Sequence, residues 1–260
     1  IIAQHQLDYL CIPEVTLWRA ISVAYAGVGL GDAQPLSDPG WIGTPRRVRE
    51  DRLVRGWTAV RERASELVRR VAPNTDLHAV IDVFNRLSAL NCMAFVFAAG
   101  HRGTRLPALN LCGLYGLPQI VFVADKSSQR YDRLRVIPRS QTIAAVLDAH
   151  LESIDALARR FASRDKSAAT RLRALVSGER PFAPVFFTVH WADHRLRLKP
   201  ITTNALRDLT HRYFDSSPNF GRHHLVSALV ESGCPRIVLR ACMGHHRAGI
   251  EPFAPDMGMS

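Results

Sequence analysis

Apolar residues recur at helical spacing along much of the chain. Between Asp51 and Val71 they fall every three or four positions, which predicts an amphipathic helix with one buried face. That face consists of Leu53, Trp57, Val60, Ala64, Leu67 and Val71, and the opposite side carries Arg52, Arg55, Arg61, Arg63, Arg69 and Arg70. The arginine side is either a solvated surface or a face that lies along a nucleic-acid backbone, and the pattern leaves both open.

Three more stretches predict helices in the middle of the chain. The polar residues 74–76 provide an N-cap for an apolar helix that leads to Arg102. The other two helices cover 142–161 and 205–214. The segment 163–184 is largely polar, so we expect it to form an insertion.

Two short stretches predict β-strands. Gln119–Ala124 and Arg133–Pro138 are rich in β-branched and apolar residues, and a polar turn that starts near Lys126 joins them. Together with the helices, this hairpin predicts a mixed α+β fold that is mainly α-helical with a small antiparallel β-sheet.

The domain organisation follows from a break in the pattern. Residues 29–48 are rich in Gly and Pro, which is typical of a connector or long loop. We therefore divide the chain into an N-terminal segment with its connector, 1–48, and one main domain, 49–260.

The C-terminal part has the pattern helix, turn, helix. Gly233 suits the left-handed position after the first helix, and Pro235 opens the second. This unit places Arg222 near one end and His245 near the other. The apolar positions of the first helix are Leu225, Val226, Leu229 and Val230, and those of the second are Ile237, Val238, Leu239 and Cys242.

These C-terminal residues resemble the catalytic domain of the tyrosine recombinases, the phage-integrase family. That family has His-x-x-Arg, then Ala-Gly, then Gly-His at corresponding spacing. Arg222, Gly233 and Gly244-His245 match this pattern, and Asn219 stands where the family has its first His.

Two upstream segments extend the resemblance to residues 75–253. Gly100-His-Arg102-Gly-Thr-Arg105-Leu is similar to the family's Gly-x-Arg-x-x-Glu-Leu segment, although Arg105 reverses the charge of the usual Glu. Lys126 corresponds to the lysine that the family carries on a β-hairpin.

The resemblance implies a specific chemistry. Arg102 and Arg222 would hold the phosphate of double-stranded DNA, because guanidinium groups bind phosphate oxygens in bidentate fashion. Lys126 would protonate the leaving oxygen, with His245 and the residue at 219 assisting. Asn219 cannot transfer a proton, so His223 or His224 would have to compensate. The resemblance implies no metal or nucleotide cofactor, and it implies a homotetramer on paired DNA sites.

The nucleophile of that family has no counterpart in this sequence. No Tyr follows Tyr213, and Phe253 stands near the expected place. The tyrosine lies beyond Ser260, comes from another protomer, or has been lost together with strand cleavage. We therefore expect a DNA breaking and rejoining enzyme or, as the alternative, a catalytically inactive DNA-binding relative. An unrelated basic protein with chance motifs is the third reading.

The composition agrees with a polyanionic partner. Lys and Arg number 34 against 23 Asp and Glu, which gives a formal net charge of +11 and a pI near 10.2. An arginine-rich composition alone would give the same charge, because the chain has only three lysines. There is no signal peptide and no uncharged apolar run of membrane-spanning length, so we expect a cytoplasmic protein without membrane association. Reduced core cysteines fit this compartment: Cys11, Cys92, Cys112, Cys234 and Cys242.

Overall fold

The fold is described by a computed structural model over residues 49–72, 75–103, 120–124, 134–180, 183–193, 195–235, 238–239 and 243. The elements within these ranges are α2 (Glu50–Arg69), α3 (Leu77–Ala98), β1 (Ile120–Ala124), β2 (Leu134–Pro138), α5 (Gln141–Phe161), α6 (Lys166–Val176), β3 (Phe187–Ala192), β4 (Arg195–Pro200), α7 (Thr203–Phe214) and α8 (Phe220–Glu231). This part of the chain is mainly helical with two small antiparallel sheets, which confirms the mixed α+β class. The N-terminal segment 1–48 lies outside the described residues.

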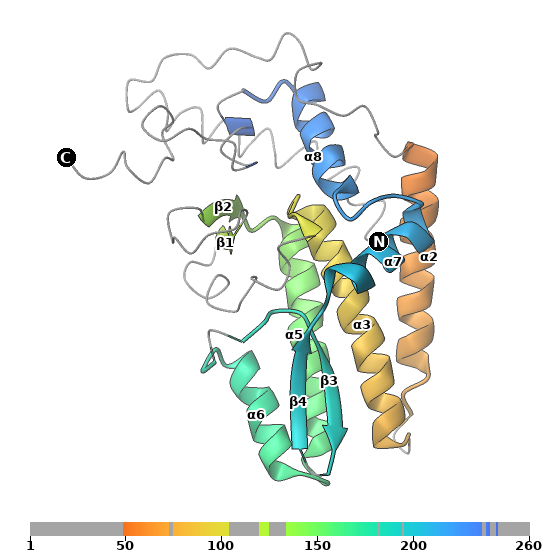
Figure 1. The fold of residues 1–260 in the computed structure, drawn as a ribbon, viewed down its shortest axis with the longest axis vertical. Helices are drawn as coiled ribbons and strands as arrows, with labels where there is room; N and C mark the ends of the chain where they lie inside the picture. The colour runs from red at the N-terminus through yellow and green to blue at the C-terminus, as the bar shows by residue number, and fades with distance from the viewer. Residues whose placement is uncertain are drawn as a thin grey trace, which may run out of the picture.

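Helix α3 is the centre of the structure, with α2, α5, α7, α8 and β3 packed around it (Figure 1). Its N-cap is Asp76, whose carboxylate accepts a hydrogen bond from the backbone N–H of His78, as the sequence predicts. Among the described helices, α3 alone is long and apolar enough to cross a membrane, but 67% of its apolar window is buried inside the protein. Its hydrophobicity is therefore that of a core helix.

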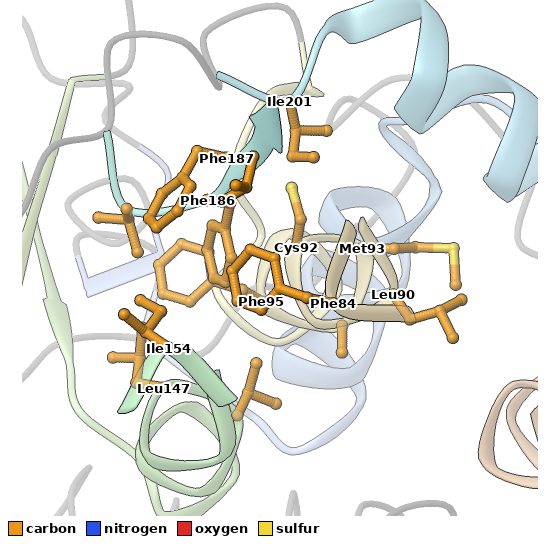
Figure 2. Close-up of a cluster of buried hydrophobic side chains, with 14 of the residues drawn as sticks. Phe84, Leu90, Cys92, Met93, Phe95, Leu147, Ile154, Phe186, Phe187 and Ile201 are labelled. Atoms are coloured by element: carbon orange, nitrogen blue, oxygen red, sulfur yellow. The ribbon is translucent and has the colours of Figure 1, made fainter. Parts of the chain in front are cut away.

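Aromatic side chains fill the space between α3, α5 and β3 (Figure 2). Phe84 and Phe95 come from α3, and Phe186 and Phe187 come from the start of the β3 segment. Phe95 and Phe187 are fully buried. Ring centroids lie 5.7 Å apart for Phe84 and Phe187 and 5.4 Å apart for Phe95 and Phe186, within the usual range for aromatic pairs.

Strand β3 is fixed to α3 by side-chain hydrogen bonds as well as by apolar packing. The amide of Asn85 donates to the carbonyl of Val189 at 3.0 Å and accepts from the Val189 N–H at 2.6 Å. The hydroxyl of Ser88 donates to the carbonyl of Phe187 at 2.7 Å. Asn85 therefore acts as a neighbouring strand would, because it satisfies both backbone groups of one strand residue.

His150 of α5 lies inside this aromatic core. Its Nε2 is 2.8 Å from the carbonyl oxygen of Val185, so Nε2 carries the proton and donates. Its Nδ1 is buried and has no hydrogen-bond partner within the described part of the chain. Burial lowers the pKa of His150 to about 4, and the hydrogen bond to Val185 opposes this only in part. His150 is consequently neutral near pH 7.

The two sheets are both simple hairpins. β1 pairs with β2 in antiparallel register from Ile120 opposite Pro138 to Ala124 opposite Leu134, which confirms the predicted strands. β3 pairs with β4 from Phe187 opposite Pro200 to Ala192 opposite Arg195. The turn that carries Lys126 lies outside the described residues.

The expectation that 163–184 forms a polar insertion is wrong for half of that segment. Residues 166–176 form α6, capped by the Asp165 carboxylate, which accepts from the Ala168 N–H at 3.0 Å. The helix packs on α5 through a narrow face, and its polar residues lie on the solvent side. Alanines supply half of that face, and because they are only weakly hydrophobic the sequence shows no clear amphipathic pattern there. Its members are Ala168, Ala169, Leu172 and Leu175.

Helix α2 buries the face predicted for it. Trp57 is 5% exposed and packs against Phe97 of α3 and Phe214 of α7, with ring centroids 5.0 and 4.9 Å away. On the polar side, Arg63 and Arg70 both form ion pairs with Glu66. These pairs lie at i, i+3 and i, i+4 on the solvent-facing side of the helix.

Candidate functional site

Helix α8 ends where the sequence pattern predicts. Asn219 is its N-cap residue, and Gly233 adopts a left-handed conformation with φ 73° just after its end. The N–H of Cys234 donates to the Leu229 carbonyl at 2.9 Å, and the N–H of Gly233 donates to the Val230 carbonyl at 3.0 Å. This pair of bonds is a Schellman motif, which confirms the predicted role of Gly233.

The chain turns back into helical conformation after this cap. The N–H of Leu239 donates to the Pro235 carbonyl at 3.0 Å, a bond with helical i, i+4 spacing. Val238, Leu239 and Met243 are buried against the apolar side of α8 and form, with Leu229 and Cys234, a second small core cluster. This cluster fixes the segment that leads to Gly244-His245.

Three glycines bring the loop after α3 against the start of α8. A Cβ at Gly221 of α8 would lie within 3.0 Å of the Phe97 backbone, so the two helices touch at this point. A Cβ at Gly100, where φ is 54°, would lie 2.8 Å from Leu225. A Cβ at Gly103 would lie 2.6 Å from Pro218. A larger residue at Gly221 or Gly103 would push these segments apart, and one at Gly100 would have to displace the Leu225 side chain and adopt a left-handed backbone.

Arg222 connects three segments that are distant in the sequence. Its side chain is buried, with the residue 6% exposed. One terminal nitrogen donates to the Gly100 carbonyl at 3.2 Å, and the other donates to the Met243 carbonyl. Gly100 begins the loop of Arg102, and Met243 directly precedes Gly244-His245. Arg222 therefore holds two of the motif segments against α8, which carries the third.

The loop of Arg102 is held at both of its ends. At one end the Gly100 carbonyl accepts from Arg222, and at the other the Gly103 carbonyl accepts from the Thr203 hydroxyl of α7 at 3.2 Å. Arg102 stands between these two bonds and is half-buried. The guanidinium of Arg102 thus belongs to a residue two positions after Gly100, whose carbonyl Arg222 binds.

Asn219 lies one helical turn before Arg222, on the same side of α8. Its side chain makes no capping bond, and its Oδ1 is buried without a hydrogen-bond partner in the part of the chain that the structure describes. Such an acceptor is costly to bury, at about 1–3 kcal/mol. The Oδ1 of Asn219 therefore does not stabilise the start of α8.

The two histidines after Arg222 have different environments. His224 is 6% exposed and stacks on Phe97 with ring centroids 5.4 Å apart, so it belongs to the core. His223 is half-buried, and burial and the positive charge of Arg222 lower its pKa. His223 is therefore neutral near pH 7. Of the two candidates to compensate for Asn219, only His223 is accessible.

The structure thus brings together Arg102, Asn219 and Arg222 of the five predicted site residues. Lys126 and His245 lie outside the described residues. No family model matches the chain, and no curated protein is similar to it. Within the described ranges, no three His, Cys, Asp or Glu residues are grouped so that they could hold a metal ion.

Sequence reasoning missed the residues that position the site. Gly221 offers the one usable signal, because glycine inside a helix costs roughly 0.5–1 kcal/mol relative to alanine and is retained where another backbone approaches closely. The bond from Thr203 to Gly103 has no signature in the local sequence. The bond from Arg222 to Gly100 spans 122 positions and is equally invisible to a local pattern.

Proposed function

We propose that this protein binds double-stranded DNA through the site around Arg102 and Arg222, as a divergent relative of the tyrosine recombinases. The observation that carries the proposal is the pair of bonds from Arg222 to Gly100 and Met243. These bonds join three of the segments on which the resemblance rests, those of Arg102, Arg222 and Gly244-His245, and chance motifs in an unrelated protein would have no reason to meet at one side chain.

In this proposal the two arginines divide the work. The carbonyls of Gly100 and Met243 fix the plane of the Arg222 guanidinium, which has five N–H donors and remains charged at any accessible pH. Arg102 supplies a second guanidinium from the adjacent loop. Together they stabilise the negative charge that accumulates on a phosphate during strand transfer.

The other proposed site residues would carry out proton transfer. Lys126 is proposed as the general acid for the leaving oxygen, and His245 as its assistant. His223 takes the place of the histidine that Asn219 replaces, because it is half-buried and neutral near pH 7. Asn219 contributes a hydrogen bond to the phosphate. No metal or nucleotide cofactor is required, since a phosphotyrosine link conserves the energy of the DNA bond.

Strand cleavage would need a nucleophile, and residues 214–260 contain no tyrosine that could serve as one. The alternative function is therefore DNA binding without cleavage, in which the same arginines hold the phosphate and no attack follows. In either case we place the protein in the cytoplasm with the nucleoid, and an active assembly would be a tetramer on paired DNA sites.

The proposal is tested with a nicked duplex that traps covalent intermediates, analysed on a denaturing gel. Binding to the same duplex is measured in parallel by fluorescence anisotropy at several salt concentrations. Arg102→Ala tests the phosphate contact without removing the buried bonds of Arg222. Arg164→Ala is the matched control, because Arg164 is an exposed arginine in the turn between α5 and α6.

A covalent band in the wild-type protein that Arg102→Ala removes and Arg164→Ala keeps would establish strand cleavage. Salt-sensitive binding without a band, weakened only by Arg102→Ala, would establish the DNA-binding alternative. Binding that does not depend on salt, or that Arg102→Ala and Arg164→Ala weaken equally, would contradict both functions.

A further inference from the structure

A second basic site lies at the other end of the molecule from α8. Figure 1 shows the start of α6 and the turn between β3 and β4 at the lower end of the long axis, and α8 at the upper end. Between α6 and β4 there is a cavity of about 320 Å³. This volume is at the lower limit of the roughly 300–1,000 Å³ typical of small-molecule sites. Its polar lining comes from Arg171, Arg195, Arg197, Ser167 and Asp165.

The arginines of β4 reach this site because of strand alternation. Leu196 is buried beneath the hairpin, so Arg195 and Arg197 lie on the opposite, exposed face. Their partners across the hairpin are Ala192 and His190, neither of which carries a negative charge near pH 7. The exposed face of the hairpin next to the cavity is therefore basic.

The positive charges of the cavity outnumber its negative charge, because three arginines and one carboxylate, Asp165, line it. Arg195 and Arg197 form no ion pair and no side-chain hydrogen bond with any described residue. Arg171 donates one hydrogen bond to the Leu196 carbonyl at 2.9 Å, which holds its guanidinium at the wall of the cavity without compensating its charge. Three guanidinium groups thus line one small cavity.

The single carboxylate in the lining is already used by the fold. One oxygen of Asp165 accepts from the Ala168 N–H at 3.0 Å, and the other accepts from the Trp191 indole N–H at 3.3 Å. Asp165 thereby caps α6 and anchors the hairpin. The N–H groups of Ala168 and Ala169 both donate to Asp165. The arginines and the Ser167 hydroxyl are the groups we assign to recognition in the cavity.

We propose that this cavity binds a phosphate group. Guanidinium groups match phosphate oxygens in planar, bidentate geometry, and several of them around one cavity favour a ligand with more than one negative charge. The Ser167 hydroxyl supplies a further donor. The phosphate belongs either to a nucleic-acid backbone or to a free phosphorylated compound. The inference does not depend on the proposed function, because it concerns residues at the opposite end of the molecule.

The test uses the full chain and two double variants of equal charge change. Arg195→Ala/Arg197→Ala removes two lining arginines, and Arg164→Ala/Arg180→Ala removes two exposed arginines that do not line the cavity. Isothermal titration with tripolyphosphate measures the pocket directly. Fluorescence anisotropy with a short duplex, at several salt concentrations, measures its share in DNA binding. Circular dichroism and thermal unfolding confirm that each variant is folded.

We expect tripolyphosphate to bind the wild-type protein and the control variant, and to bind Arg195→Ala/Arg197→Ala at least tenfold more weakly. If the phosphate comes from DNA, the salt slope of duplex binding also falls by about one per arginine removed. If the slope is unchanged, the pocket serves a free phosphorylated compound. Absence of tripolyphosphate binding in the wild-type protein, or equal binding by both double variants, would overturn the inference. Failure of the wild-type protein to bind the duplex would overturn only the proposed function.

Discussion

The core around α3 and the region around α8 are built by different means. Between α3, α5 and β3, large aromatic side chains such as Phe187 are fully buried, and the polar bonds of Asn85 and Ser88 join neighbouring elements. Around α8, close contacts depend on glycines, and the main polar connection is one buried arginine, Arg222. The α3 core derives its stability from buried apolar surface. The α8 region depends on a few residues, and none of them can be replaced by another type without loss of a contact.

This contrast separates scaffold from site. Apolar burial is not directional, so the α3 core can tolerate some repacking. The α8 region has to hold the Arg102 loop and the segment before His245 in fixed positions, and directional hydrogen bonds and small residues provide that precision. Damage to the first region should therefore unfold the whole domain, whereas damage to the second should first release individual segments.

The largest effect is expected from Phe187→Ala. Phe187 is fully buried between Phe84 and His150, so its truncation should lower the free energy of unfolding by about 3–5 kcal/mol and lower the midpoint of the entire transition. His190→Ala, on the exposed face of the same strand, should change it by less than about 0.5 kcal/mol. Denaturant titration of both variants checks this. Similar losses in the two would contradict the assignment of the core.

His150 should make the α3 core sensitive to acid. The pKa of His150 is lowered from 6.5 to about 4 in the folded protein, so the unfolded chain binds the proton more readily. Neutral His150 therefore contributes to the free energy of unfolding above pH 6.5. This contribution is lost as the pH falls towards 4, by about 3 kcal/mol in total. His150→Gln retains a donor for the Val185 carbonyl but does not titrate.

The difference in unfolding free energy between the wild-type protein and His150→Gln measures this contribution, because all other groups cancel. It should shift by about 3 kcal/mol in favour of the variant between pH 7 and pH 4. A difference that is constant over this range would show that His150 is not held neutral by burial.

Gly221→Ala should release α8 from α3. The added Cβ would meet the backbone of Phe97, which cannot move aside as a side chain would. We expect a loss of about 1–3 kcal/mol, typical of overpacking, and weaker DNA binding because the Arg102 loop shifts. Thermal unfolding and anisotropy measure the two effects. Unchanged stability would mean that the two helices do not touch at Gly221.

Gly233→Ala should have the smallest effect on the free energy of unfolding, and its cause differs from that at Gly221. No atom lies within 4 Å of a Cβ at Gly233, so the only cost is the left-handed backbone with φ 73°. That cost is about 1–2 kcal/mol for a residue with a side chain. Gly233→Asn should recover part of it, because asparagine tolerates this conformation. Equal losses for alanine and asparagine would argue against a conformational origin.

The sequence predicted the elements whose signals are local. The apolar spacing of α2 and α5, the cap at Asp76 and the left-handed Gly233 are all visible within a few residues. Helix α6 was missed because alanines supply half of its buried face, and alanine carries little weight in an apolar pattern. The resemblance to the tyrosine recombinases implied that Arg102 and Arg222 share a site, but their connection depends on contacts across more than a hundred positions. Local periodicity carries no information about such contacts.

Arg222 holds the loop of Arg102 and the segment before His245 against α8. Amide hydrogen exchange in Arg222→Met tests this connection most directly, because methionine keeps most of the buried volume and removes both donors. We expect faster exchange at 100–103, 238–239 and 243, with unchanged exchange in α3 and α5. Unchanged exchange in both segments would show that Arg222 does not hold them.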